Sequence, residues 1–351
     1  MTTQGTPALP PSVALMQMIT GSLVGQAIHV AAKLGVADAL KDGPKGREAL
    51  AKDVGADPEA LYRVLRALAS FGIFAEDGEG RFALTPLAEC LRSDVPGSMR
   101  AFATVFGEPW RWRTLGEIVH SVRTGQPAFD KLHGMNLFEY LTRNPEDARL
   151  FGEAMTSFSR REFTGASIGE IDAVLQAYDF SAFRRVVDVA GGHGSFIAAA
   201  LKANPGLGGV LFDVPPVIED ARKYLVAEGL VERCEAVGGS FFDGVPAGGD
   251  VYVMKRVIHD WDDARAAAIL TQCRRAMAPG GRVALVEMVI PAGNTPFFGK
   301  IVDLEMLLIG GRERTASEYR ALLASAGFEL TRIVPTQSPL SIVEGVPVQG
   351  A

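Results

Sequence analysis

The chain has 351 residues, of which 48% are hydrophobic and 22% are charged, and its formal net charge is −6. This is the composition of a globular protein, and the length favours two domains over one. The acidic balance argues against a nucleic-acid-binding protein, which usually presents a basic face.

The cysteines and the first residues indicate the compartment. Cys90, Cys234 and Cys273 are far apart and have no metal-ligand spacing, which predicts reduced thiols in a cytoplasmic protein. The N-terminal residues lack the basic and apolar segments of a secretion signal. No uninterrupted apolar run is long enough to span a bilayer, so we expect no membrane association.

The first part of the chain, residues 1–105, is predicted as an all-helical domain of the winged-helix type with a β-hairpin as its wing. Residues 12–40 are apolar at helical spacing and predict a helix that is buried on more than one side. Asp57 and Pro58 are typical of a helix start, and Gly72 of a helix end. One face of that helix is apolar, with Leu61, Val64, Leu65 and Leu68. Residues 73–85 predict two short strands around Asp77-Gly78.

A winged helix suits either a DNA-binding regulator or an interaction module. Arg63 and Arg66 are predicted to face outward, but the neighbouring segment DVGADPEA is acidic or apolar. We therefore favour the interaction module and expect no nucleic-acid partner. The long apolar helix has more apolar surface than a small domain can cover, which predicts a homodimer.

Residues 106–180 are predicted as a helical bridge that contributes to a substrate pocket. Aromatic residues and methionines are mixed there, and they suit either a core or the lining of a site for a flat organic molecule. Five of them are considered: Met135, Phe138, Phe151, Met155 and Phe158. As substrate contacts we predict Met155, Phe158 and, from a later apolar segment, Met306.

From about residue 181 to residue 351, apolar strands alternate with amphipathic helices. This alternation predicts a mainly parallel sheet covered by helices on both faces. Ligands of such sheets bind at the carboxyl ends of the strands. The side chains that follow these strands are therefore the candidates for a binding site.

The stretch VVDVAGGHGSF, residues 186–196, follows the first of these strands. It has neither the third glycine of a dinucleotide fingerprint nor the Gly-Lys-Ser/Thr ending of a phosphate loop. Asp188 can face a cation, Gly191 and its neighbours allow close approach of a ligand, and Asp213 ends the next strand where an acid would bind ribose hydroxyls. Ser240 and Phe241 end the following strand, where an adenine would lie. A cationic amino-acid end, an adenosine and no phosphate describe S-adenosylmethionine.

Six segments in this order resemble the caffeate O-methyltransferase-like family of small-molecule methyltransferases: DVAGGHGSF, FDVPPVI, VGGSFFD, MKRVIHDWDD, MAPGGRVALVEMVIP and GGRERTASEYRALLASAGF. The resemblance covers almost the whole chain. It implies a Rossmann-like class I methyltransferase domain behind a winged-helix dimerisation domain. It also implies a general base at His259, two acids that orient it at Glu287 and Glu313, and cofactor contacts at Gly191, Asp213 and Lys255.

Two positions depart from the family's pattern. Ser240-Phe241 stands where Asp-Met or Asp-Phe is common, which removes an acidic contact to the adenine. Ala190 stands where glycine is usual, a small change that we expect to be tolerated.

The chemistry of methyl transfer agrees with this site. A phenol has a pKa near about 10, so a neutral histidine that accepts its proton makes the oxygen a better nucleophile. His259 has acidic neighbours, of which we interpret Asp260 as an anchor of the loop. We expect an O-methyltransferase for a phenolic or enolic small molecule of secondary metabolism, without a metal. The alternatives are an enzyme of the same fold that catalyses hydroxylation, decarboxylation or a pericyclic step, and a winged-helix transcriptional regulator.

Overall fold

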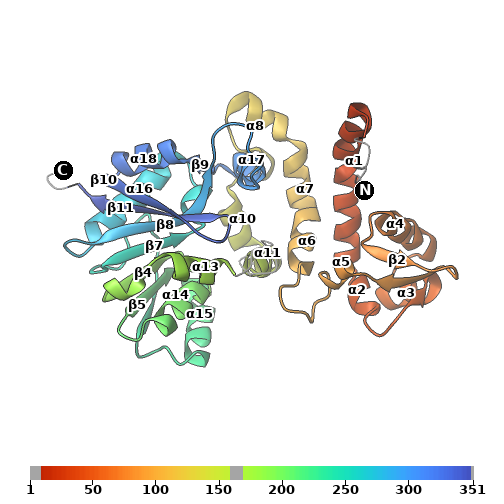
Figure 1. Ribbon diagram of the computed structural model, residues 1–351, viewed down its shortest axis with the longest axis horizontal. Helices are drawn as coiled ribbons and strands as arrows, with labels where there is room; N and C mark the ends of the chain where they lie inside the picture. The colour runs from red at the N-terminus through yellow and green to blue at the C-terminus, as the bar shows by residue number, and fades with distance from the viewer. Residues whose placement is uncertain (1–8, 159–168, 349–351) are drawn as a thin grey trace, which may run out of the picture. The chain divides into compact units, whose positions relative to one another are not determined.

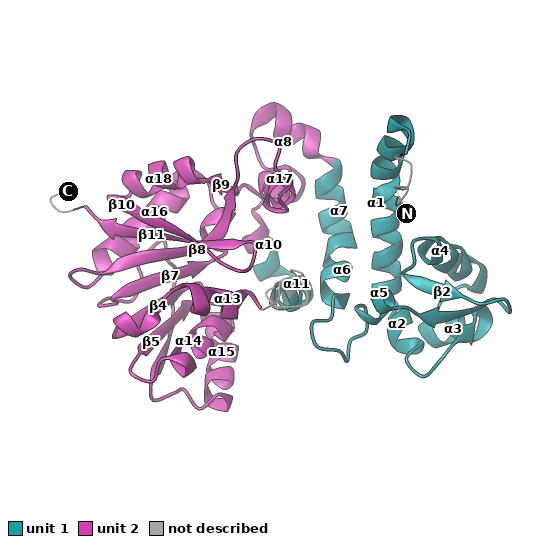
Figure 2. Cartoon of the chain, viewed as in Figure 1, with its two compact units in different colours: residues 1–116, 141–158 teal, residues 117–140, 159–351 magenta. Residues whose placement is uncertain are grey.

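The computed structural model describes residues 9–158 and 169–348. The chain forms two compact units, residues 1–116 with 141–158 and residues 117–140 with 159–351 (Figure 2). The segment 106–180, predicted as a separate bridge, is thus shared between the two units, with one boundary inside helix α10 (Leu137–Arg143).

The first unit is mainly helical and includes a small sheet (Figure 1). Its helices are α1 (Pro11–Lys33), α2 (Val36–Ala39), α3 (Arg47–Val54), α4 (Pro58–Ser70), α5 (Pro86–Glu89), α6 (Arg100–Gly107), α7 (Pro109–Gly116) and α11 (Pro145–Phe158). Its strands β1 (Lys45–Gly46), β2 (Phe74–Glu76) and β3 (Arg81–Leu84) form an antiparallel sheet in the order β1-β3-β2.

The winged helix is formed as the sequence predicts. The Asp57 carboxylate accepts a hydrogen bond from the Ala60 amide at 2.8 Å and caps α4, whose first residue is Pro58. The predicted apolar face of α4 is in the core of the unit, where Leu61, Leu65 and Leu68 are buried. Strands β2 and β3 make the predicted hairpin, and β1 adds a third strand that the sequence pattern did not indicate.

Helix α1 is only partly covered within the chain, which agrees with the prediction that its apolar surface exceeds what one small domain can cover. Large apolar side chains of its N-terminal half are exposed within the chain, namely Leu15, Met16, Met18, Ile19 and Leu23. The 23 residues of α1 are also long and apolar enough to cross a membrane by length and composition, which the sequence analysis did not expect of any segment. Only 6% of its most apolar window is buried within the chain.

The second unit is a sheet with helices on both faces. Its helices are α8 (Ile118–Thr124), α9 (Ala128–His133), α13 (Glu170–Ala177), α14 (Ser195–Ala203), α15 (Pro215–Ala227), α16 (Asp263–Ala276), α17 (Gly299–Ile309) and α18 (Ala316–Ser325), with 3-10 turns η1 (Phe180–Ala182) and η2 (Ile258–Asp260). Its strands are β4 (Arg185–Val189), β5 (Gly208–Asp213), β6 (Cys234–Gly238), β7 (Val251–Lys255), β8 (Arg282–Ile290), β9 (Arg314–Thr315), β10 (Phe328–Pro335) and β11 (Leu340–Pro347).

The main path of the sheet has the order β10-β11-β8-β7-β4-β5-β6, and β9 pairs with β8. Strands β4 to β8 are parallel to one another, whereas β11 is antiparallel to both β8 and β10. This is the predicted doubly covered sheet. The carboxyl ends of β4 to β8 therefore meet at one edge, where a ligand site is expected.

The two faces of the sheet have different partners (Figure 1). Helices α13, α14 and α15 lie on one face, and α16 and α18 on the other. Val187 and Val189 of β4 belong to the core cluster of α16 and α18. Because side chains alternate along a strand, Asp188 points to the opposite face, towards α14.

Candidate active site

The glycine loop after β4 encloses the Asp188 carboxyl group. A Cβ atom at Gly191 would lie 2.4 Å from Asp188 Oδ2 and 2.5 Å from Leu211 Cδ1. Glycine is therefore required at 191 by the protein's own side chains, whereas a Cβ at Gly192 would meet nothing within 4 Å. The close approach of Gly191 to Asp188 and Leu211 is a further reason for glycine that the sequence alone did not indicate.

Ala190 lies in the same loop and has a φ of 55°. An L-residue in this left-handed region costs about 1–2 kcal/mol, whereas glycine reaches it freely. This explains why glycine is usual at the position. The Ala190 amide is held by the Phe212 carbonyl at 2.7 Å, so the loop keeps its course despite the strain.

Asp188 has the properties of a carboxylate that can bind a cation. It is 1% exposed, and its Oδ2 has no hydrogen-bond partner. Burial raises its pKa to about 7, against the nearby charge of Lys255 and with the help of Asp213. The positively charged end of S-adenosylmethionine would stabilise the ionised form, so this buried, unsatisfied oxygen fits the predicted cofactor.

Asp213 ends β5 beside the same loop. Its Oδ2 accepts the Gly192 amide at 2.8 Å, and its Oδ1 accepts the Val214 amide at 2.7 Å. Burial raises the pKa of Asp213, while these backbone hydrogen bonds oppose the rise. The carboxylate is thus fixed at the strand end, where the sequence predicts a ribose contact.

Ser240 and Phe241 follow β6, but the two side chains differ in use. The Ser240 hydroxyl accepts the Phe242 amide at 3.2 Å and stabilises its own turn. The Phe241 ring packs edge-on against Trp261 at 5.8 Å, and Phe138 stacks on Trp261 at 5.5 Å. Trp261 was missed by the sequence analysis, although it stands in the HDWDD segment, because a single tryptophan after a strand does not show which rings it will meet.

Lys255 ends β7 and lies in a buried group of charges. Its Nζ is 3.8 Å from Glu170 Oε2, and Glu170 also accepts a 2.6 Å hydrogen bond from Arg256. Burial lowers the pKa of Lys255, and Glu170 and Asp188 oppose that change. Glu170, the first residue of α13, was not singled out from the sequence.

His259 lies in η2 and is 7% exposed. Its Nδ1 is 2.7 Å from Glu313 Oε1, which is a hydrogen bond, and 3.9 Å from Glu287 Oε2, which is too long for one. Its Nε2 is 3.4 Å from Asp260 Oδ1. The structure thus brings the three predicted residues together and adds Asp260, which the sequence analysis interpreted as a loop anchor.

The two glutamates hold different parts of the loop. Glu287 is on β8, and its Oε1 accepts the amides of Val257 and Ile258 at 3.1 and 2.9 Å. It therefore fixes the backbone before His259, while Glu313 contacts the imidazole itself. Sequence spacing could not separate these roles, because both acids are distant from His259 along the chain.

The charges of the cluster are strongly coupled. Burial lowers the pKa of His259, but Asp260, Glu287 and Glu313 outweigh it and raise the pKa to about 9. Burial raises the pKa of Glu287 to about 7 and that of Asp260 to about 6. The imidazolium form is thus well stabilised, which is what a base needs after it has accepted a proton.

The predicted substrate contacts fall in different units. Met306 is a buried residue of α17, which packs against η2 and so lies in the unit of His259. Met155 is on α11 of the first unit, and the side chain of Phe158 is outside the described part of the structure. Substrate contact by all three stays a prediction.

Ligand atoms of His259, Glu287 and Glu313 lie within 4.8 Å of one another, a set that could also hold a metal ion. The 2.7 Å separation of Nδ1 and Oε1 is that of a direct hydrogen bond. The absence of a metal from the reaction stays a prediction.

Comparison with known proteins gives the family. Residues 112–329 match the model of the O-methyltransferase domain, and residues 16–94 match the O-methyltransferase dimerisation domain. Phenazine O-methyltransferase PhzM of Lysobacter antibioticus is 47% identical, with 97% of this chain and 98% of that protein covered. The 8-amino-8-demethylriboflavin N,N-dimethyltransferase of Streptomyces davaonensis is 39% identical, with 90% of both chains covered.

Solved structures agree. The crystal structure of LaPhzM has a TM-score of 0.90 with this chain at 46% identity and covers 97% of this chain and 100% of its own. NcsB1 from neocarzinostatin biosynthesis, in complex with S-adenosylmethionine and 2-hydroxy-5-methyl naphthoic acid, has a TM-score of 0.81 at 35% identity, with 92% and 96% covered. The chain belongs to the O-methyltransferase family of S-adenosylmethionine-dependent enzymes, with a dimerisation domain before the catalytic domain.

Proposed function

We propose that the protein methylates a hydroxyl group of an aromatic, phenolic small molecule of secondary metabolism and that His259 is the general base. The observation that carries this proposal is the 2.7 Å hydrogen bond between Glu313 and His259 Nδ1. A carboxylate at Nδ1 fixes the proton there and leaves Nε2 as the basic atom.

S-adenosylmethionine supplies an activated methyl group, so the protein's tasks are alignment and proton removal. Asp188, Gly191, Asp213 and Lys255 are the residues that would hold it, with Phe241 and Trp261 as ring surfaces for the adenine and Ser240 at the same strand end. As the hydroxyl oxygen bonds to the methyl carbon, the carbon–sulfur bond breaks and the sulfur becomes neutral. The hydroxyl proton passes to His259 Nε2, and Glu313 and Asp260 stabilise the resulting imidazolium.

The family relatives include both O- and N-methyltransferases by name. The buried base favours a hydroxyl acceptor. A neutral aromatic amine can attack before it loses a proton, whereas a neutral phenol is a poor nucleophile until a base accepts its proton. Names of relatives such as a phenazine enzyme and a naphthoate complex support a fused-ring acceptor. Met306 is the substrate contact that lies in the same unit as the base.

Labelled S-adenosylmethionine and a panel of hydroxylated and amino-substituted fused-ring aromatics test the proposal. We expect transfer to hydroxyls that survives EDTA, is lost by at least about 100-fold in His259→Ala, and is unchanged in the control His120→Ala. The His120 side chain contacts only Thr124 of α8 among the described hydrogen bonds. Transfer to amines alone, or full activity of His259→Ala, would contradict the proposal.

We further infer a homodimer formed through the N-terminal unit. The exposed apolar side chains of α1, with Met18 77% and Leu23 70% exposed, form a surface that water disfavours. Residues 16–94 match the family's dimerisation domain, which includes most of α1. A second copy of this unit would cover the surface.

A further inference from the structure

Arg314 is the largest fully buried side chain in the described part of the protein, with 0% exposure. It is the first residue of β9 and directly follows Glu313. An arginine has five N–H donors in a fixed planar arrangement. A buried one is costly unless these donors are used, so their acceptors show what the residue holds in place.

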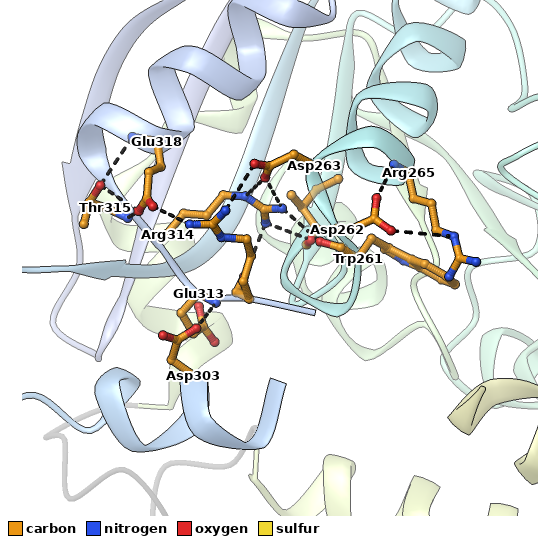
Figure 3. A network of polar contacts seen from close by, with 11 residues as sticks. Trp261, Asp262, Asp263, Arg265, Asp303, Glu313, Arg314, Thr315 and Glu318 are labelled. Atoms are coloured by element: carbon orange, nitrogen blue, oxygen red, sulfur yellow. Dashed lines mark hydrogen bonds and ion pairs between the residues drawn. The ribbon is translucent and has the colours of Figure 1, made fainter. Parts of the chain in front are cut away.

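The donors of Arg314 bind both sides of the turn that contains His259, and Figure 3 shows the side of Trp261. Nη1 donates to the Ile258 carbonyl at 3.1 Å, and Nη2 donates to the Trp261 carbonyl at 2.9 Å. These two carbonyls flank His259 and Asp260. The guanidinium therefore connects the residues before and after the base.

The same side chain also binds its own segment and the helix that follows the turn. Nη1 reaches the Arg312 carbonyl at 3.3 Å. Nε and Nη2 donate to Asp263 Oδ1 at 2.9 and 2.8 Å, and Asp263 is the first residue of α16 (Figure 3). Every part of the guanidinium thus has an acceptor.

Other contacts bring the two segments together along their length. The Arg312 amide donates to the His259 carbonyl at 2.8 Å. A Cβ at Gly311 would lie 2.2 Å from that carbonyl oxygen, so only glycine allows this approach. Asp303 Oδ1 accepts the Glu313 amide at 2.8 Å and fixes the backbone that carries the carboxylate (Figure 3).

The hydrogen bond between His259 and Glu313 depends on this arrangement, because its two partners come from segments 54 residues apart. We propose that Arg314 is a positioning residue that sets the distance between the His259 turn and the segment that carries Glu313 before β9, and so aligns the imidazole for proton removal. It acts through backbone carbonyls and touches no reacting atom. This inference rests on the proposed function of His259.

A role in capping α16 alone does not explain these contacts. Asp262 is the capping residue of α16, with its Oδ1 accepting the Arg265 amide at 2.8 Å. Arg312 also pairs with Asp263 and with Glu318, but none of its described side-chain hydrogen bonds reaches the turn carbonyls. The contacts to Ile258 and Trp261 belong to Arg314, and they are the ones that face the base.

The test compares Arg314→Lys, Asp263→Asn and the control Arg312→Gln with the wild type. Lysine keeps the charge but loses the planar fork. Asp263→Asn is the milder variant, because its side chain is 60% exposed and asparagine can still accept from Arg314. Full-length proteins are compared by thermal melting, cofactor affinity, the pH profile of methyl transfer, and NMR titration of the histidine rings.

We expect Arg314→Lys to lower kcat by about 10- to 100-fold, since a displacement near 1 Å at a reacting group has such effects. The KM for S-adenosylmethionine should stay within about twofold, because Arg314 is not predicted to contact the cofactor. His259 is faced by Asp260, Glu287 and Glu313, and Glu313 is the partner expected to move. The NMR titration midpoint of His259 should therefore fall by about one unit or more. Asp263→Asn should show the same changes to a smaller degree, and Arg312→Gln none.

Retention of the wild-type His259 midpoint in folded Arg314→Lys or Asp263→Asn would overturn the inference. A loss of kcat that only follows the amount of folded protein would do so as well. The NMR readout needs no turnover. If His259→Ala remains active, the proposed function fails, while the titration still decides whether Arg314 positions the ring.

Discussion

Replacement of Glu313 by glutamine removes the negative charge beside His259, the proposed base. The size of the side chain at position 313 stays almost unchanged. The hydrogen bond from Nδ1 to a charged acceptor is worth about 1.5–3 kcal/mol, compared with about 1 kcal/mol for a neutral one. One pKa unit corresponds to about 1.36 kcal/mol. The difference of about 0.5–2 kcal/mol should therefore lower the pKa of His259 from about 9 to about 7.5–8.6.

This shift has opposite effects on the two ends of the pH profile. At pH 9.5 the wild-type base is largely neutral, and the variant lacks the charge that stabilises the imidazolium, so kcat/KM should fall by about 2- to 30-fold. At pH 7 the wild-type base is largely protonated, whereas the variant has a larger neutral fraction. At pH 7 the larger neutral fraction of the variant therefore nearly offsets its weaker stabilisation of the imidazolium. The difference in kcat/KM between the variant and the wild type should almost disappear.

The assay is kcat/KM for a phenolic acceptor between pH 6.5 and 9.5, because this quantity reports the free enzyme. The control is Glu318→Gln, which makes the same exchange five residues later in the capping box of α18. Glutamine also serves at that position, and Glu318 has no described contact with His259. A deficit of Glu313→Gln that is uniform over the pH range, or largest at pH 7, would refute this account of the base.

Three further variants test the glycine loop after β4 and the proposed dimer. Asp188 has a folded pKa raised to about 7, so the stability it contributes is complete below its ordinary value of 3.8 and is lost as the pH rises through 7. Asp188→Asn should therefore raise the unfolding free energy of the ligand-free protein at pH 8 by up to about 4 kcal/mol, which is measured as a higher melting temperature. The same variant should bind S-adenosylmethionine more weakly in calorimetry. A lower melting temperature at pH 8 would contradict the burial argument. Ala190→Gly should raise stability by about 0.5–1 kcal/mol in denaturant unfolding, since relief of the positive φ exceeds the entropy cost of glycine; an unchanged or lower midpoint would show that the loop is not strained. Leu23→Glu on α1 should give monomers in light scattering with an intact fold by circular dichroism, and a persistent dimer would place the interface elsewhere.

The strand-helix alternation was sufficient to predict the sheet and the edge at which Asp188 and Asp213 would gather, whereas Lys255 and the role of His259 came from the family resemblance. Parallel strands bring their carboxyl ends together, so each side chain needed only its own strand to be recognised. Glu313 could not be placed in this way. It directly precedes β9, a strand of two residues, which is too short to show an alternation of apolar and polar residues. Its place came from the family resemblance.

Other contacts depend on the directions of side chains in three dimensions, which the sequence pattern does not give. Asp260 and His259 are neighbours in a 3-10 turn, and only the turn's geometry brings Oδ1 within 3.4 Å of Nε2. Arg314 was not singled out in the sequence, and it is completely buried. The apolar pattern of α1 predicted more surface than one domain covers, but it did not indicate which residues of the helix stay exposed.

The position of β11 in the sheet has a consequence for biosynthesis. This last described strand, Leu340–Pro347, lies between β10 and β8, and Ser341 is paired with Glu287. Until these residues leave the ribosome, β8 has an open edge that can pair with other chains. Removal of residues 340–347 should therefore expose this edge and produce aggregation rather than an inactive soluble protein.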